Sequence, residues 1–232
     1  WATIGRAYLM TILVTVIGTA LSLGITSTFA FAVSNDKLPG HKILMFLCIF
    51  TMLFNGGLVA SYYVYSNIFH IKNTIWALIV PTFLMSPFNV VLVKNYFSNS
   101  ISPSILEAAR MDGAGVFAVF TKIVIPLSVP IMATVGLMTA IGYWNDWTNG
   151  LYYLTENGGA QYYTIQLVLN RINENINFLA NNSDVAAKAA QQLPSTTMRM
   201  AIAVIGILPI MCAYPFFQKY FVKGITLGGV KE

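Results

Sequence analysis

The residues best suited to specific chemistry lie at positions 107–115, which read EAARMDGAG. This polar patch carries Glu107, Arg110 and Asp112 between two stretches that are apolar enough to cross a lipid bilayer. The alanines and glycines beside these charges leave the surface nearly bare of side chains, so the backbone of another protein could approach closely. The patch therefore suits polar contacts with a second protein, and an ordinary amphipathic surface loop is the alternative interpretation.

A second group of residues has the chemistry of a sugar site, because aromatic faces and fixed polar groups together bind pyranose rings. Asparagines inside predicted membrane spans also need hydrogen-bond partners there. An aromatic belt at the membrane interface, side-chain packing, or hydrogen bonding between helices would explain the same residue types. The candidates for a solute pathway are Tyr143, Trp144, Asn145, Asp146, Trp147, Asn55 and Asn89.

Catalytic motifs are missing from the sequence. It has no GxxxxGK[ST] loop for ATP phosphates, no HExxH, no GxSxG and no Cys/His metal cluster. We therefore predict a non-catalytic chain that binds no cofactor or metal of its own and takes its energy from another subunit or from a gradient. Cys48 and Cys212 fall inside predicted spans, where buried thiols are expected rather than a disulfide.

The composition is that of a membrane protein. Only 9% of the residues are charged, against about 25% in soluble domains, and 56% are hydrophobic. Long runs lack Lys, Arg, Asp and Glu, for example between Arg6 and Asp36, and a spanning helix needs roughly 20 mostly apolar residues. Backbone groups in lipid must be paired internally, so we predict an all-α, polytopic fold. The five predicted spans are residues 8–33, 43–66, 74–93, 119–142 and 200–218.

The basic residues predict the orientation of these spans. If helices alternate in direction, eight basic residues fall on one side and five on the other, and the richer side is expected to be cytoplasmic. That side holds the loop 94–118, while the loop 143–199 is external, with short helices expected around 161–173 and 183–192. We expect a further piece before Trp1, giving six spans in one transmembrane domain that includes all of residues 1–232. Basic residues spread singly along the chain argue against nucleic-acid binding.

The polar patch itself is predicted to form two helices joined by a sharp turn. Ser102 can cap the first helix by accepting a backbone N–H, and Pro103 then occupies the first helical position. Gly113 stands where a left-handed residue ends a helix. The second helix is expected to start at about Ala114 and to continue into the span 119–142.

A longer pattern around the patch resembles a known family. Glu107-Ala108-Ala109 is followed after three residues by Gly113, and after nine more by Ile123, then Ile125-Pro126. This spacing resembles the EAA signature of permease subunits of binding-protein-dependent ATP-binding-cassette (ABC) importers, with Ile125 where leucine is usual. Other segments are similar to the maltose-type oligosaccharide and polysaccharide group of these permeases: LPGHK (38–42), FNGGL (54–58), NTIWALIVP (73–81), YWNDW (143–147) and FQKYFVKGITLGGVK (217–231).

The resemblance implies a coupling helix that sits in a groove of a cytoplasmic ATPase, which binds the ATP and magnesium. The residues implied in ATPase coupling are Glu107, Ala108, Ala109, Asp112 and Gly113. It further implies a second homologous permease in a heterodimer, an extracellular solute-binding protein that delivers an oligosaccharide, and a multi-pass location in the bacterial cytoplasmic (inner) membrane.

Two other functions remain open at this point. A permease for a non-sugar solute would carry the same EAA loop, because that loop reports the energy source and not the solute. A gradient-driven carrier would usually show inverted repeats and ionisable residues at the bilayer midplane, and we see neither.

Overall fold

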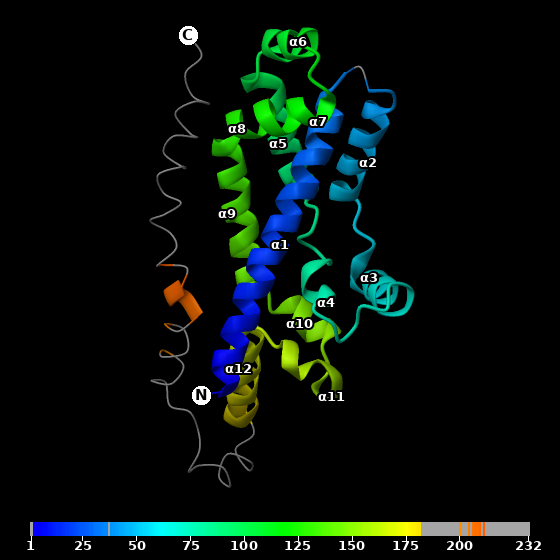
Figure 1. Cartoon of the computed structure of the whole chain (residues 1–232). Coiled ribbons are helices and arrows are strands. Elements are labelled where there is room, and N and C mark those ends of the chain that lie inside the picture. The colour runs from blue at the N-terminus through cyan, green and yellow to red at the C-terminus, as the bar shows by residue number, and fades with distance from the viewer. Residues whose placement is uncertain are drawn as a thin grey trace. The chain divides into compact units, whose positions relative to one another are not determined.

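The computed structural model describes residues 2–36, 38–181, 200, 204, 206–209 and 211. These residues form helices joined by turns, with no strand among them, so the all-helical prediction is confirmed. The predicted span 200–218 and the short helix expected around 183–192 lie largely or wholly outside the described residues. The helices in chain order are α1 (Ala2–Ser34), α2 (His41–Leu53), α3 (Gly57–Tyr63), η1 (Val64–Ile68), α4 (Trp76–Ile79), α5 (Pro87–Ser100), α6 (Pro103–Met111), α7 (Val116–Val119), η2 (Phe120–Val124), α8 (Ile125–Leu127), α9 (Val129–Asn145), α10 (Thr148–Tyr153), α11 (Glu156–Gly159), η3 (Ala160–Tyr162) and α12 (Ile165–Asn181) (Figure 1).

Helix α1 is the one continuous helix of the described chain that is long and apolar enough to cross a membrane. It covers the helix predicted over 8–33 and has a mean hydropathy of 2.0 in its most apolar window. Some of its hydroxyl side chains donate to carbonyl oxygens one turn earlier, as Thr11 does to Ala7 at 2.8 Å and Thr28 to Gly24 at 2.8 Å. Such bonds satisfy polar groups within an apolar helix without another element.

Two further segments reach the length of a span only if a bent pair of helices counts as one. In the predicted span 43–66 the chain leaves the helix after Leu53 and re-enters it at Gly57, where φ is +82°. In the predicted span 119–142 the helices bend by 80° around Ser128. Pro126 and Pro130 flank that bend. The number of spans stays a prediction.

The single helix predicted over 74–93 is wrong. Helix α4 ends at Ile79 and α5 begins only at Pro87, with turns between them. Thr82 has a φ of +70°, which a right-handed helix cannot contain, and Ser86 is extended before Pro87. Hydropathy predicted the length of this apolar stretch, but the two prolines of 81–87 interrupt its backbone.

The described chain divides into two compact units, each with its own core. Unit 2 comprises residues 17–61, 82–140 and 216–232, of which the last segment lies outside the described residues. Its core is built from residues of α1, α5 and the helices from α7 to α9. The fully buried members are Ala30, Val93, Phe97, Ile101, Val119, Val124 and Val135.

Unit 1 comprises residues 1–16, 62–81 and 141–215, as far as they are described. Its packing brings α10 against both α4 and α12. Buried hydrogen bonds join distant segments: the amide of Ile165 donates to Thr11 Oγ1 at 2.9 Å, and the Tyr143 hydroxyl donates to the carbonyl of Ile79 at 2.8 Å. Asn73 fastens the loop before α4, since its Oδ1 accepts from the amide of Thr155 at 2.7 Å.

Candidate functional site

The candidate coupling loop begins where α5 ends. Ile101 is extended and buried, so the chain turns sharply before Pro103 opens α6 at its first position. The predicted capping bond of the Ser102 hydroxyl to a backbone amide is wrong, because this hydroxyl pairs with the Ser104 hydroxyl at 2.7 Å. The carbonyl of Ser102 accepts from the amide of Ile105 at 3.1 Å instead.

The end of α6 is a glycine-dependent turn. Gly113 has a φ of +79°, and its amide donates to the carbonyl of Arg110 at 3.0 Å. The amide of Ala114 donates to the carbonyl of Ala109 at 2.9 Å. These two bonds form a Schellman motif, in which the left-handed residue is usually glycine because it carries no Cβ. The predicted helix, turn and helix are therefore present, although the second helix starts at Val116 rather than Ala114.

Helix α6 has an inner and an outer face within unit 2. Leu106, Ala109 and Ala114 pack against the core described above. Glu107, Ala108, Arg110, Asp112 and Gly113 are exposed. The described part of the chain offers no ion-pair partner to any of the three charges of this loop. Of the two alanines in the EAA signature, Ala109 therefore packs against the unit and Ala108 lies on the exposed face of the helix.

Three apolar residues around the turn are also exposed, and the sequence analysis did not identify them. Met111 is 87% exposed, Val116 72% and Phe117 76%. Met111 follows Glu107 by four residues, a spacing that places two side chains on one helical face and could have identified it. Exposed apolar groups beside exposed charges are typical of surfaces that bind another protein.

Asp146 of the candidate solute pathway is held by local hydrogen bonds. Its Oδ1 accepts from the amides of Thr148 and Asn149, each at 3.1 Å, and its Oδ2 accepts from Asn149 Nδ2 at 2.7 Å. The residue is 8% exposed, and this burial raises the pKa of its carboxyl, while the bonds from Asn149 and Thr148 oppose the rise. The carboxylate caps the start of α10, although the residue directly before that helix is Trp147.

The aromatic neighbours of Asp146 divide into buried and exposed members. Tyr143 and Trp144 are buried, and Trp144 Nε1 donates to the carbonyl of Gly206 at 3.1 Å. Trp147 is 38% exposed, and the exposed Asn145 donates its Nδ2 to Ile141 of its own helix at 3.0 Å. The segment thus does not present its aromatic rings to one common cavity.

The two asparagines of the candidate pathway have different surroundings. Asn89 is buried, and its Nδ2 donates to Thr139 Oγ1 at 3.3 Å, a bond between two helices of unit 2. Asn55 is exposed in the break after α2, and its Oδ1 accepts from the amide of Gly57 at 2.8 Å. Asn89 thus joins helices, whereas Asn55 shapes a turn and keeps its amide nitrogen accessible.

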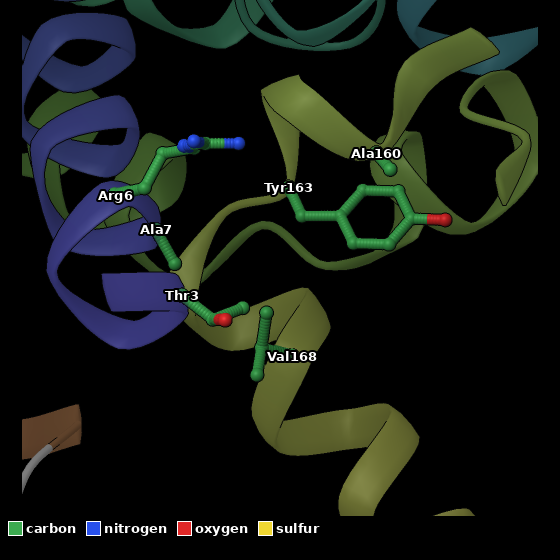
Figure 2. Close-up of a pocket in the computed structure, with 6 residues that line it drawn as sticks. All are labelled: Thr3, Arg6, Ala7, Ala160, Tyr163 and Val168. Atoms are coloured by element: carbon green, nitrogen blue, oxygen red, sulfur yellow. The ribbon is translucent and has the colours of Figure 1, made fainter. Parts of the chain in front are cut away.

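A small pocket of about 110 Å³ lies in unit 1. Figure 2 shows Arg6 of α1 and Tyr163 of the segment before α12 on its wall. The Arg171 guanidinium lies 4.4 Å from the centre of the Tyr163 ring and pairs with Glu156 at 2.9 Å, whereas Arg6 makes no ion pair within the described residues. A guanidinium and an aromatic ring that line one pocket suit a carboxylate-bearing ring. The pocket is lined by Thr3, Arg6, Ala7, Ala160, Tyr163 and Val168.

No group of histidine, cysteine, aspartate and glutamate side chains in the described part of the chain could hold a metal ion.

Comparison with known proteins gives three related findings. Residues 5–227 match the family of binding-protein-dependent transport system inner membrane components. The chain is 37% identical to the polygalacturonan/rhamnogalacturonan transport system permease protein YtcP of Bacillus subtilis, over 97% of this chain and 77% of that one. It is 30% identical to the maltodextrin transport system permease protein MalD of Streptococcus pneumoniae, over 98% and 75%.

A solved structure agrees with these relatives. It is a bacterial ABC transporter involved in the import of the acidic polysaccharide alginate, and one of its chains is 32% identical to this chain. The match has a TM-score of 0.80 and covers 94% of this chain and 75% of that one. The chain therefore belongs to the family of binding-protein-dependent transport system inner membrane components, the permease subunits of ABC importers.

Proposed function

We propose that this chain is the multi-pass permease subunit through which an ATP-driven importer moves an oligosaccharide across the bacterial inner membrane. The proposed partners are cytoplasmic ATPase subunits, a second homologous permease and an extracellular solute-binding protein. Within this complex the chain supplies the passage and the coupling contact, while the ATPase supplies the energy. The observation that carries the proposal is the two-faced helix α6 with its glycine turn.

The two faces of α6 suit a coupling element. A helix that transmits movement must be fixed on one side and free on the other, and α6 meets both conditions. Leu106 and Ala109 anchor it to the core of unit 2, and Glu107, Asp112 and Met111 remain exposed for a partner. Because the core is closely packed, displacement of α6 by a docked ATPase shifts the helices beneath it instead of being absorbed locally.

The proposed solute is an acidic oligosaccharide. Two related importers are named for acidic polymers, polygalacturonan and alginate. The pocket in unit 1 is lined by Arg6, a guanidinium without an ion-pair partner among the described residues, and by the ring of Tyr163. A uronate ring carries both the carboxylate and the apolar face that these groups bind.

Two glycine variants test the coupling role. Neither Gly113 nor Gly115 has a heavy atom within 4 Å of an added Cβ, but only Gly113 has a positive φ. Gly113→Leu forces an ordinary residue into the left-handed region at a cost of about 1–2 kcal/mol, whereas Gly115→Leu adds the same bulk without that strain. We expect Gly113→Leu to assemble in the membrane and hydrolyse ATP without uptake, and Gly115→Leu to retain more coupling.

The measurement compares ATP hydrolysis with uptake of a glycan panel in vesicles that contain the whole complex and its binding protein. The panel includes oligogalacturonides and maltodextrins, so acidic and neutral solutes are compared directly. Uptake by the Gly113→Leu complex at the parental rate would refute the coupling role. Uptake of maltodextrins alone would refute the acidic solute and leave the coupling role intact.

A further inference from the structure

Helix α2 is too short to cross a membrane. Its 13 residues from His41 to Leu53 rise about 20 Å at the helical rise per residue, against a hydrocarbon core of about 30 Å. The charged end of this helix, at His41 and Lys42, belongs at the membrane surface. The break at Phe54–Gly56 therefore falls within the depth of the hydrocarbon core.

The break leaves backbone groups without helical partners. The amide of Phe54 donates to the carbonyl of Phe50 at 2.9 Å, and the helix then ends. The carbonyls of Thr51, Met52 and Leu53 lose the amides that a continuing helix would supply, and the amide of Gly57 is taken by Asn55 Oδ1 at 2.8 Å. Residues 51–60 are all exposed within the described chain. Lipid offers these carbonyls no donors, so this surface must meet water or polar groups of another molecule.

Aromatic rings accompany the break. Phe46, Phe50 and Phe54 follow one another at four-residue spacing and are 65%, 43% and 64% exposed. Their ring centres are 6.1 Å apart from Phe46 to Phe50, and 4.5 Å apart in a stacked pair from Phe50 to Phe54. The rings thus form a continuous apolar strip that ends at the polar backbone of the break and at Asn55.

We propose that the strip Phe46–Phe50–Phe54, together with Asn55, faces the solute path and binds the sugar ring. This inference rests on the proposed function and identifies a solute-binding wall for it. The apolar face of a pyranose stacks on Phe54, and its hydroxyls donate to the free carbonyls of α2 and accept from Asn55 Nδ2. An added Cβ at Gly57 would meet nothing within 4 Å, so the backbone here is open to close approach. A sugar brings the hydroxyl donors that these carbonyls need, which neither lipid nor an apolar helix of a partner provides.

Cysteine accessibility in the assembled complex tests the proposal. Cys48→Ala and Cys212→Ala remove the native thiols, and Phe54→Cys, Asn55→Cys and Val16→Cys are introduced singly. Val16 is a matched control, because it is 62% exposed and lies on the uninterrupted helix α1. We expect a charged, membrane-impermeant thiosulfonate to modify positions 54 and 55 at least tenfold faster than position 16. An imported oligogalacturonide, presented with its binding protein, should slow the modification several-fold.

Each other result overturns the proposal. Modification of positions 54 and 55 only by a membrane-permeant maleimide would place the break against lipid. Protection in the complex, but not in the chain expressed alone, would place it against the second permease. Modification that no imported solute slows would refute the sugar contact. Uptake by the cysteine-free parent is measured in the same vesicles, so a failure of the proposed function is recognised separately from the labelling result.

A kinetic comparison guards against misfolded cysteine variants. Phe54→Tyr keeps an aromatic face, and Phe54→Leu keeps the apolar volume without the ring. We expect Phe54→Leu to raise the KM for uptake at least fivefold and Phe54→Tyr to remain near the parental value. Equal KM values for the two variants would contradict stacking on this ring.

Discussion

The carboxylate of Asp146 provides the sharpest test of whether a polar residue here supports the fold or contacts the solute. It accepts three hydrogen bonds, from the amides of Thr148 and Asn149 and from Asn149 Nδ2. All three donors belong to the first turn of α10, a helix that packs against α4 and α12. Asp146→Ala would therefore loosen the start of α10 and, through it, the packing of α10 against α4 and α12.

The expected cost follows from these bonds. Removing a capping side chain costs about 0.5–2 kcal/mol, and a buried donor left without a partner costs about 1–3 kcal/mol. Removal of the buried charge offsets part of this, because burial already raises the pKa of the carboxyl. We expect a net loss of about 2–3 kcal/mol for Asp146→Ala. Asp146→Asn should lose only about 1 kcal/mol, since it keeps one acceptor oxygen but turns an amide toward Asn149 Nδ2.

The assay compares thermal unfolding of the purified complex with oligosaccharide uptake. Asn145→Ala is the matched control, because Asn145 is adjacent, exposed and bonded only weakly beyond its own helix, to Gln166 at 3.5 Å. Asp146→Ala should lower the midpoint by about 5–10 °C, using the usual ratio for chains of this size, and Asn145→Ala should change it little. If Asp146→Ala abolishes uptake while its midpoint matches that of Asn145→Ala, the carboxylate contacts the solute and the structural account is wrong.

Three further predictions concern buried polar groups of unit 1. Burial raises the pKa of Asp146 in the folded protein above its pKa in the unfolded chain, so between the two the folded state keeps the proton that the unfolded state releases. The stability that the protonated carboxyl contributes is therefore fully present below the ordinary aspartate pKa and is lost as pH rises through the raised pKa. Asp146→Asn should remove this part of the pH dependence of the thermal unfolding midpoint. Tyr143→Phe removes the donor to the carbonyl of Ile79 and should destabilise the complex by about 1–2 kcal/mol, measured as a lower midpoint; an unchanged midpoint would contradict the role of this bond. Thr11→Val keeps the side-chain shape but leaves the amide of Ile165 without its acceptor, which should cost about 1–3 kcal/mol, whereas Thr28→Val, whose bonds stay within one helix, should cost less.

Local features of the coupling loop were predictable from the sequence. Pro103 and Gly113 restrict the backbone wherever they occur, so the start of α6 and its left-handed end follow from residue type alone. The absence of the predicted Ser102 cap could not be foreseen in this way, because the Ser102 hydroxyl pairs with the Ser104 hydroxyl and not with a backbone amide. The inner and outer faces of α6 depend on Val93 and Phe97, which belong to another helix and cannot be inferred from the loop itself.

The predicted spans show a limit of hydropathy as evidence. Hydropathy measures whether a stretch suits lipid and gives no direct information on whether its backbone is continuous. Residues 74–93 carry no charged side chain and still form two helices separated by turns, since Thr82 adopts a positive φ. Pro81 lies in this interruption, and its carbonyl accepts a hydrogen bond from Asn149 Nδ2 at 3.4 Å, a contact with a distant segment that hydropathy cannot report.

The hydrogen bonds of each candidate pathway residue distinguish structural roles from solute contact. Asp146, Tyr143 and Asn89 all bond to partners within their own unit, so replacing those partners with a transient sugar would cost stability on every transport cycle. Within the described residues, Asn55 bonds only through its oxygen, which accepts from the amide of Gly57, and it lies beside carbonyls that helix α2 does not pair. A solute that passes through must bind weakly enough to leave, and groups that the fold does not already require can make and release such bonds at little cost. The break after α2 therefore meets this requirement better than the aromatic segment from Tyr143 to Trp147.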